Sequence, residues 1–194
     1  MVSWIYRWWV AAALGLGVLL VCLLPIPILQ WQWKAFTVLI YLHTPIYMLH
    51  QVEEHLGDRF RRFVNDEIYG GLDALTPVAV LWTNIPCVWG VTGVALYFAV
   101  VAGAGWGLIA TYLVAVNGAV HFVGAVVKRR YNPGLVTAVL LFLPLSGITF
   151  WKSANKASWV QHATGLLVAV IIHAVLVIHT RQRANRLRAA GAVT

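Results

Sequence analysis

Charged residues are scarce in this chain, and acidic residues are the scarcest of them. Asp, Glu, Lys and Arg make up 10% of the 194 residues, and only six are Asp or Glu. A soluble domain carries about 25% charged residues, so this composition excludes one. Hydrophobic residues reach 61%, and the mean hydropathy is +0.79. We therefore expect an all-α, polytopic membrane protein that forms one helical bundle over residues 1–194.

Cysteines and nucleotide-binding motifs are also few or missing. The two cysteines, Cys22 and Cys87, lie in long apolar runs, so we expect small buried side chains rather than a disulfide. No glycine-rich nucleotide motif is present, so nothing indicates a nucleotide cofactor. The net charge of +8 does not indicate a nucleic-acid partner, because the basic residues lie in short segments beside apolar runs. That distribution follows the positive-inside rule for membrane proteins.

Six apolar stretches are long enough to span a bilayer. With a cytoplasmic N-terminus, eleven of the 14 Lys and Arg residues lie on the cytoplasmic side, and only Lys34, Lys152 and Lys156 lie outside. This asymmetry predicts an even number of spans with both termini in the cytoplasm, and we expect a bacterial inner membrane. The basic tail, 181–194, is expected to extend the last helix along anionic lipid. The predicted spans are 8–26, 34–54, 76–101, 106–127, 134–151 and 158–180.

The most informative motif is His50-Gln51-Val52-Glu53-Glu54, at the end of the second predicted span. Positions i, i+3 and i+4 are neighbours on one helix face, so His50, Glu53 and Glu54 can converge. Carboxylates near the hydrocarbon are costly unless they are paired, hydrated or bound to an ion. The motif therefore predicts a metal site. The alternative is a helix end that emerges into water with its carboxylates facing Arg59 or Arg130.

Two further histidines are predicted at a similar depth. With a rise of about 1.5 Å per residue, His50, His121 and His173 lie about 6, 9 and 10 Å from the cytoplasmic ends of their spans. Scattered structural histidines would not be expected to share one depth. His43 lies two turns from His50 on the same face and is a further candidate. The candidate metal ligands are His50, Glu53, Glu54, His121, His173 and His43.

We expect other polar residues of the predicted spans to support the metal ligands or to lie at the membrane interface. Asn117 lies one turn before His121 and is a candidate to orient it by a hydrogen bond. Asn84 is a second candidate for such a supporting role. His55 points about 100° away from Glu54 around the helix, so we expect it at the membrane interface.

The predicted ligands indicate a class of chemistry. Helical zinc peptidases use two ligands one turn apart with a catalytic Glu beside them. His50 and Glu54 have this spacing, and His121 adds a second imidazole while one position stays open. A zinc-bound water would have a pKa of about 7, and Glu53 is the candidate general base. His173 would then be a fourth ligand or an oxyanion stabiliser.

The same ligands do not determine which metal is bound. Two histidines and one carboxylate form the facial triad of non-heme iron oxygenases. A second ion held by His43 and Glu53, as in helical di-iron bundles, is a further alternative. The expected cofactor is therefore a divalent metal ion, zinc ahead of iron, present as one ion or two.

These residues carry a resemblance to a known family. The His-x-x-Glu-Glu stretch resembles the signature of the HXXEE-domain family, small bacterial membrane proteins named for that motif. Asn117-Gly-Ala-Val-His121 and Arg130-Tyr131-Asn132-Pro133-Gly134 are also similar to it. The resemblance covers about residues 36–180 and implies a metal site at His50, Glu53, Glu54 and His121, but no particular reaction. A weaker similarity links the Glu-Glu pair to CAAX-type intramembrane metalloproteases, although Arg59 follows Glu54 by five residues instead of their four.

The leading hypothesis is a metal-dependent membrane enzyme, a zinc hydrolase acting on a lipidic or membrane-embedded substrate near the cytoplasmic leaflet. The alternatives are a non-heme iron oxidoreductase, a proton or metal-ion transporter that uses His and Glu, and an accessory protein whose polar cluster stabilises packing. Membrane lipids and an amphiphilic substrate are the expected partners, and association into a homo-oligomer stays open. Lys128, Arg129 and Arg130 are candidates to hold an anionic lipid headgroup.

Overall fold

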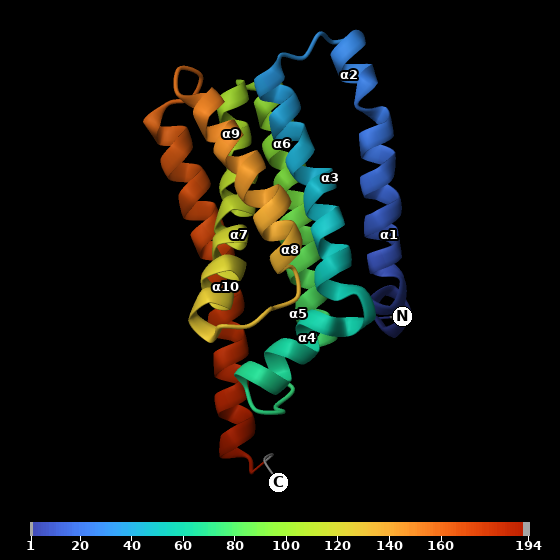
Figure 1. Cartoon of the computed structure of the whole chain (residues 1–194), viewed down its shortest axis with the longest axis vertical. Helices are drawn as coiled ribbons and strands as arrows, with labels where there is room; N and C mark the ends of the chain where they lie inside the picture. The colour runs from blue at the N-terminus through green and yellow to red at the C-terminus, as the bar shows by residue number, and fades with distance from the viewer. Residues whose placement is uncertain (1, 192–194) are drawn as a thin grey trace.

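The computed structural model describes residues 2–191, and every regular element in this range is helical. Figure 1 shows a bundle of long helices with both chain ends toward the same end of the bundle. The predicted all-α bundle is confirmed. Its six long segments are α1 (Val2–Leu23) with α2 (Pro25–Leu29), α3 (Ala35–His55), α5 (Pro77–Trp82) with η3 (Thr83–Gly90) and α6 (Val91–Val101), η4 (Ala104–Gly107) with α7 (Leu108–Lys128), α8 (Leu135–Thr137) with η5 (Ala138–Phe142) and α9 (Leu143–Ser153), and α10 (Trp159–Ala189).

Five of these segments are long and apolar enough to cross a membrane, namely Ser3–Leu29, Pro77–Val101, Ala104–Lys128, Leu135–Ser153 and Trp159–Ala189. The second predicted span, α3, does not meet the same hydropathy criterion, although its 21 residues are long enough. Its hydropathy is low because His43, His50, Gln51 and Glu54 lie on it. All four are buried inside the bundle, so the polarity of α3 faces protein and not lipid.

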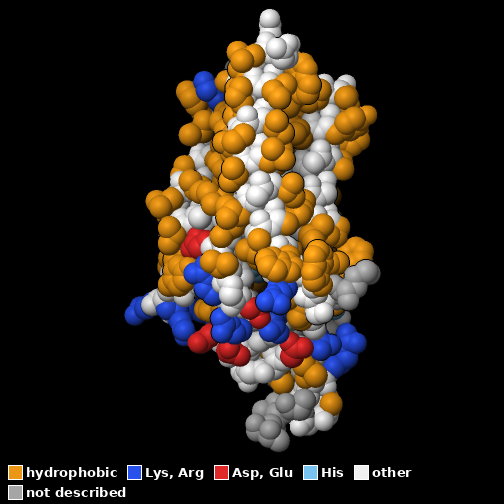
Figure 2. All heavy atoms as spheres, turned by 90° about the vertical axis from the view of Figure 1, so that its right-hand side faces the viewer, with side chains coloured by type: hydrophobic (Ala, Val, Ile, Leu, Met, Phe, Trp, Pro, Cys, Tyr) orange, Lys and Arg blue, Asp and Glu red, His pale blue; other side chains and the backbone are white. Residues whose placement is uncertain are grey.

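The outer surface has an apolar band and a charged end. Figure 2 shows hydrophobic side chains along most of the bundle, with Lys, Arg, Asp and Glu gathered toward its lower end. Ion pairs at that end join Arg61 to Asp58 and Asp73, and Arg183 to Asp73. The connection from α3 to α5 lies there and contains η1 (Leu56–Asp58), α4 (Arg59–Arg62) and η2 (Phe63–Ile68). This distribution matches the asymmetry of basic residues, and the assignment of this end to the cytoplasm stays a prediction.

Local sequence signals set the beginnings of two spanning segments. The Thr76 side chain accepts a hydrogen bond from the Ala79 N–H, and Pro77 follows as the first residue of α5. At the start of α10, Ser158 and Gln161 form a capping box, in which each side chain accepts from the other residue's backbone N–H. From there α10 continues past residue 180 to Ala189, so the basic tail does extend the last helix.

The helix α3 lies between α1 and most of the remaining helices, and Trp9 of α1 also packs on Val80 of α5. On one side Gly17 of α1 comes close to Met48. On the other side α7 and η5 pack against α3 around the buried Tyr47, Leu113 and Phe142. The outer face of α1 has no such neighbour, and Cys22 on it is exposed. The prediction that both cysteines are buried is therefore wrong for Cys22, and Cys87 is only partly buried, although both are free thiols.

Candidate metal centre

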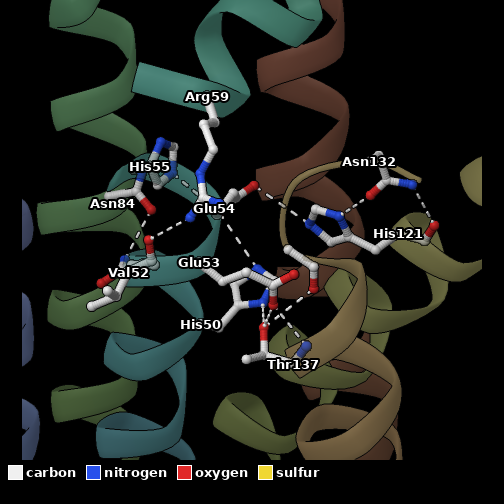
Figure 3. A network of polar contacts seen from close by, with 12 residues as sticks. His50, Val52, Glu53, Glu54, His55, Arg59, Asn84, His121, Asn132 and Thr137 are labelled. Atoms are coloured by element: carbon white, nitrogen blue, oxygen red, sulfur yellow. Dashed lines mark hydrogen bonds and ion pairs between the residues drawn. The ribbon is translucent and has the colours of Figure 1, made fainter. Parts of the chain in front are cut away.

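Three buried side chains from two helices meet at the lower end of α3. Glu54 Oε2 lies 3.5 Å from His50 Nε2, and Glu54 Oε1 lies 3.4 Å from His121 Nε2 on α7 (Figure 3). One ligand atom from each residue lies within 4.8 Å of the others, and none of the three residues is more than 5% exposed. The sequence prediction that His50, Glu54 and His121 converge is confirmed.

The two His–Glu distances are longer than ordinary hydrogen bonds and match the separation of two ligands on one ion, while the three ligand atoms as a set lie within 4.8 Å of one another. Typical N–H···O hydrogen bonds measure about 2.7–3.2 Å, shorter than the 3.4 and 3.5 Å found here. Zinc ligands at about 2.0–2.1 Å and tetrahedral angles lie about 3.4 Å apart. In addition, the buried Nε2 of His50 has no hydrogen-bond partner among the described residues. A divalent ion between the imidazole nitrogens and the buried carboxylate would give this unpaired nitrogen a partner.

A hydroxyl group fixes the protonation of His50. Thr137 Oγ1 lies 2.7 Å from His50 Nδ1 and 2.6 Å from Glu53 Oε2. A hydroxyl has one proton, and the carboxylate can only accept, so Thr137 donates to Glu53 and accepts from the Nδ1–H of His50. We therefore assign His50 the tautomer whose Nε2 carries a lone pair toward Glu54, as a metal ligand requires.

Asn132 does the same for His121. The Nδ1–H of His121 donates to Asn132 Oδ1 at 2.6 Å, and Asn132 Nδ2 donates back to the His121 carbonyl at 2.9 Å. Both contacts are buried. This support had been predicted for Asn117, whose Oδ1 instead has no hydrogen-bond partner in the described chain. Asn132 belongs to the turn after α7, where its amide can reach both ends of the His121 residue.

Replacing Asn132 with alanine should therefore weaken metal binding without removing a ligand. Loss of a group that orients a ligating histidine costs about 10- to 100-fold in metal affinity. Competition with a chromophoric chelator would measure this change in purified protein. Asn185→Ala, on the exposed end of α10, is the matched control and should bind as the parent does. An unchanged affinity in Asn132→Ala would contradict the assignment.

Glu53 does not point at the cluster, although the sequence suggested it as a ligand and general base. Its oxygens accept hydrogen bonds from the Val136 and Thr137 N–H groups at 3.1 and 2.7 Å, and from the Tyr131 and Thr137 hydroxyls at 2.8 and 2.6 Å. Burial and the Glu53 carboxylate raise the pKa of Tyr131, so its phenol remains a donor. These donors lie on the loop after α7 and on α8, so they hold the Glu53 carboxylate against that part of the chain. The structure gives it a positioning role.

His55 is part of the site and not an interfacial residue, contrary to the sequence expectation. It is 5% exposed, and its Nε2 lies 3.1 Å from Glu54 Oε2. The helix ends immediately after it, and the ring turns back toward Glu54. Asn84 lies 3.3 Å from the same nitrogen and accepts from Gln51, whose own oxygen accepts from Trp89. Asn84 therefore supports His55 and Gln51, and it reaches Glu54 only through His55.

The alternative of a solvated helix end is not what the structure shows. Glu54 is 4% exposed, and neither nearby arginine pairs with it. Arg59 donates to the backbone carbonyls of Val52 and Leu56. Arg130 makes a two-point ion pair with Glu67 on the surface. The only charged or imidazole groups within 4 Å of the Glu54 carboxylate in the described chain are three histidines.

Gly134 brings the loop against both imidazoles. Its φ of +98° lies in a region that favours glycine. A Cβ at this position would lie 2.7 Å from His50 Cε1 and 2.8 Å from His121 Cε1. In the sequence, Asn132-Pro133-Gly134 stands out only through the family resemblance. In the structure, this turn closes one side of the cluster.

The remaining candidate ligands lie outside the cluster. His173, on α10, lines a cavity of about 320 Å³ together with Glu54, His121 and Asn117. Its Nδ1–H donates to the Ala169 carbonyl at 2.8 Å, which leaves Nε2 as an acceptor. His43 donates from Nδ1 to the Leu39 carbonyl, and its Nε2 has no partner in the described residues. A second ion held by His43 and Glu53 finds no support, because the Glu53 oxygens are bonded to the loop.

Of the three basic residues predicted to hold a headgroup, only Lys128 lines the cavity. Arg130 is paired with Glu67, as described above. Arg129 ends α7 in the left-handed conformation, with φ of 51°.

Comparison with known proteins places the site inside a known sequence family. The family described as "Protein of unknown function with HXXEE motif" matches residues 41–151. This range contains His50, Glu54 and His121 as well as the loop that orients them, and it leaves out α1 and α10. No curated protein and no solved structure matches the chain. The chain belongs to the HXXEE-motif family, whose function is unknown.

Proposed function

We propose that the protein is a membrane-embedded, metal-dependent enzyme in which His50, Glu54 and His121 hold one divalent ion, with zinc the expected metal. The observation that carries this proposal is the meeting of two imidazole nitrogens and one carboxylate inside the bundle, with 3.4 and 3.5 Å between facing atoms. Their orientation is fixed by Thr137 and Asn132, which engage the Nδ1 atoms and leave the Nε2 atoms free. Such supporting contacts are typical of metal-binding histidines.

A hydrolytic reaction is the class that the surroundings support best. A bound divalent ion would polarise a water molecule or a substrate carbonyl. Glu54 and His121 line the cavity, so a molecule there reaches the cluster directly. We assign His173 as the proton acceptor in this cavity, because its Nδ1 is used by Ala169 and its Nε2 can only accept. This replaces Glu53 in the role of general base.

An oxidoreductase is the second candidate, and it rests on the same ligand set. Two histidines and one carboxylate also bind non-heme iron, so the identity of the metal separates the two reactions. A transporter would need a path through the bundle beyond the cluster. Apolar side chains such as Tyr47, Leu113 and Phe142 pack beside the cluster, and further buried polar side chains, among them His43, Thr111 and Ser146, lie elsewhere in the bundle.

The deciding experiment is metal analysis of the protein purified in detergent without chelators. We expect stoichiometric zinc in the parent protein and loss of the metal in His121→Ala and Glu54→Gln. His179→Ala and Glu67→Gln are the matched controls, because both residues are exposed and lie outside the cluster. Both controls should keep the metal. His173→Gln should also keep it, since His173 is assigned to proton transfer.

If the bound metal is iron instead of zinc, the second candidate, a non-heme iron oxidoreductase, becomes the better proposal. Absence of metal from the parent protein, or equal metal content in the parent and in Glu54→Gln, would overturn the metal centre and with it the enzyme.

A further inference from the structure

The helix α10 packs on its neighbours along one face, and part of that face lines the cavity beside the proposed metal centre. Near its beginning, Gly165 of α10 packs directly on Leu108 and Tyr112 of α7. Near its other end, Thr180 hydrogen-bonds to Tyr69, and Ala184 packs into the segment after η2. Ile172, His173, Leu176, Val177 and Thr180 of α10 line the cavity of about 320 Å³.

Three of the four exposed residues that line this cavity are apolar, and the fourth is Lys128. Val120 on α7 is 56% exposed and Val177 on α10 is 60% exposed, and both line the cavity. Each lies in a segment that is long and apolar enough to cross the membrane. Ile68, at the end of η2, is also exposed on the rim. An opening lined in this way faces hydrocarbon, so the molecule that enters it comes from the bilayer.

The inner wall carries polar atoms that lack partners. Asn117 Oδ1 and His55 Nδ1 have no hydrogen-bond partner among the described residues, and both residues line the cavity. Glu54 and His121 line the same cavity. Lys128 is the only Lys or Arg in the described lining, and its ammonium lies 5.6 Å from the centre of the Phe63 ring. An apolar volume with polar atoms on one wall and one cation suits an anionic amphiphile.

We propose that this cavity binds an amphiphile with a single hydrocarbon chain and an anionic headgroup, which enters between α7 and α10. Its volume of about 320 Å³ lies at the small end of the roughly 300–1,000 Å³ found for ligand sites, which suits one hydrocarbon chain. Lys128 attracts the headgroup, and the linkage between head and chain lies beside Glu54 and His121. The role of this molecule as a substrate rests on the proposed function, whereas its binding does not.

Photolabelling in nanodiscs of zwitterionic lipid tests the proposal. The probe is a long-chain fatty acid with a diazirine in its chain, and the readout is the labelling that excess unlabelled fatty acid displaces. We expect displaceable labelling on α7 and α10 in the parent protein and its loss in Val120→Trp, whose indole fills the rim. Val123→Trp is the matched control, because Val123 is 54% exposed on the same helix and does not line the cavity. Equal displaceable labelling in the two variants would overturn the proposal.

A second measurement tests whether the cavity prefers an anionic headgroup. Lys128→Gln should weaken the binding of the fatty acid about fivefold, since one lysine near a membrane surface contributes a factor of this size toward an anionic headgroup. A fatty alcohol of equal chain length should bind the parent and Lys128→Gln alike. If the alcohol displaces the probe from the parent as well as the acid does, the anionic headgroup is wrong.

Parallel metal analysis separates this inference from the proposed function. Displaceable labelling in a protein without metal would support the amphiphile site and contradict the proposed metal-dependent enzyme. Stoichiometric metal without displaceable labelling would support the metal centre and contradict the proposed amphiphile site.

Discussion

Replacing Gly134 with alanine is expected to abolish metal binding, although Gly134 contributes no ligand. The new Cβ would lie 2.7 and 2.8 Å from carbon atoms of His50 and His121, whereas ordinary contacts begin near 3.4 Å. At least one imidazole must therefore move by several tenths of an ångström. Metal–ligand distances tolerate only about 0.2 Å, so the two rings can no longer hold one ion together. Metal analysis of Gly134→Ala would show this loss.

Gly70→Ala is the control for backbone strain. Gly70 also has a positive φ, of +67°, but a Cβ there would meet nothing within 4 Å. Both variants should lose about 1–3 kcal/mol of unfolding free energy from the strained backbone. Gly70→Ala should nevertheless keep its metal. Metal retained in Gly134→Ala would show that the loop yields more easily than the imidazoles, and it would contradict the close packing described here.

Replacing Glu53 with alanine is expected to destabilise the whole bundle. The carboxylate accepts from the Val136 and Thr137 N–H groups, which open α8 and have no carbonyl partner within the helix. The partly buried Thr137 N–H costs about 1–3 kcal/mol when it is left unpaired, whereas the exposed Val136 N–H can bond to water, so we expect a loss of about 1–3 kcal/mol. Thermal unfolding in detergent, followed by circular dichroism, measures this effect. The metal should bind more weakly as well, because Thr137 loses the carboxylate that orients it toward His50.

Glu67→Ala gives the comparison for this variant. Glu67 accepts two hydrogen bonds where Glu53 accepts four, and the partner of Glu67, Arg130, is about half exposed. Exposed ion pairs contribute about 0–1 kcal/mol, so Glu67→Ala should unfold almost as the parent does. Thr137→Ser, which keeps the hydroxyl, should retain the metal. If Glu53→Ala were as stable as Glu67→Ala, Glu53 would not hold α8, and a direct chemical role would again be the better explanation.

The helical part of the site could be predicted from the sequence because helix geometry is regular. The i, i+4 spacing places His50 and Glu54 on one face, and the depth of His121 in its span brings it to the same level. His173 has nearly the same calculated depth, yet it lines the cavity instead of joining the cluster. Depth along a helix says nothing about rotation around it, and this is the information that the sequence lacked.

The loop part of the site could not be predicted in the same way. Asn132, Gly134 and Thr137 reach the imidazoles because the chain turns back across the end of α3, and no periodicity records such a path. The adjacent acids show the same limit. Glu53 and Glu54 look equivalent in the sequence, but one faces the loop and the other faces His121. A signal was present in Arg130 to Gly134, which carried part of the family resemblance without a residue-level role.

The buried polar face of α3 also affects how the chain would be drawn across a membrane. A count based on hydropathy finds five crossings, an odd number, and so assigns the two termini to opposite compartments. Every helix after α3 would then be inverted, and the four arginines between residues 181 and 188 would lie outside, against the positive-inside rule. The structure places both chain ends toward the same end of the bundle. A topology map that omits α3 would therefore invert every helix after α3, including α7, which carries His121 of the candidate metal site.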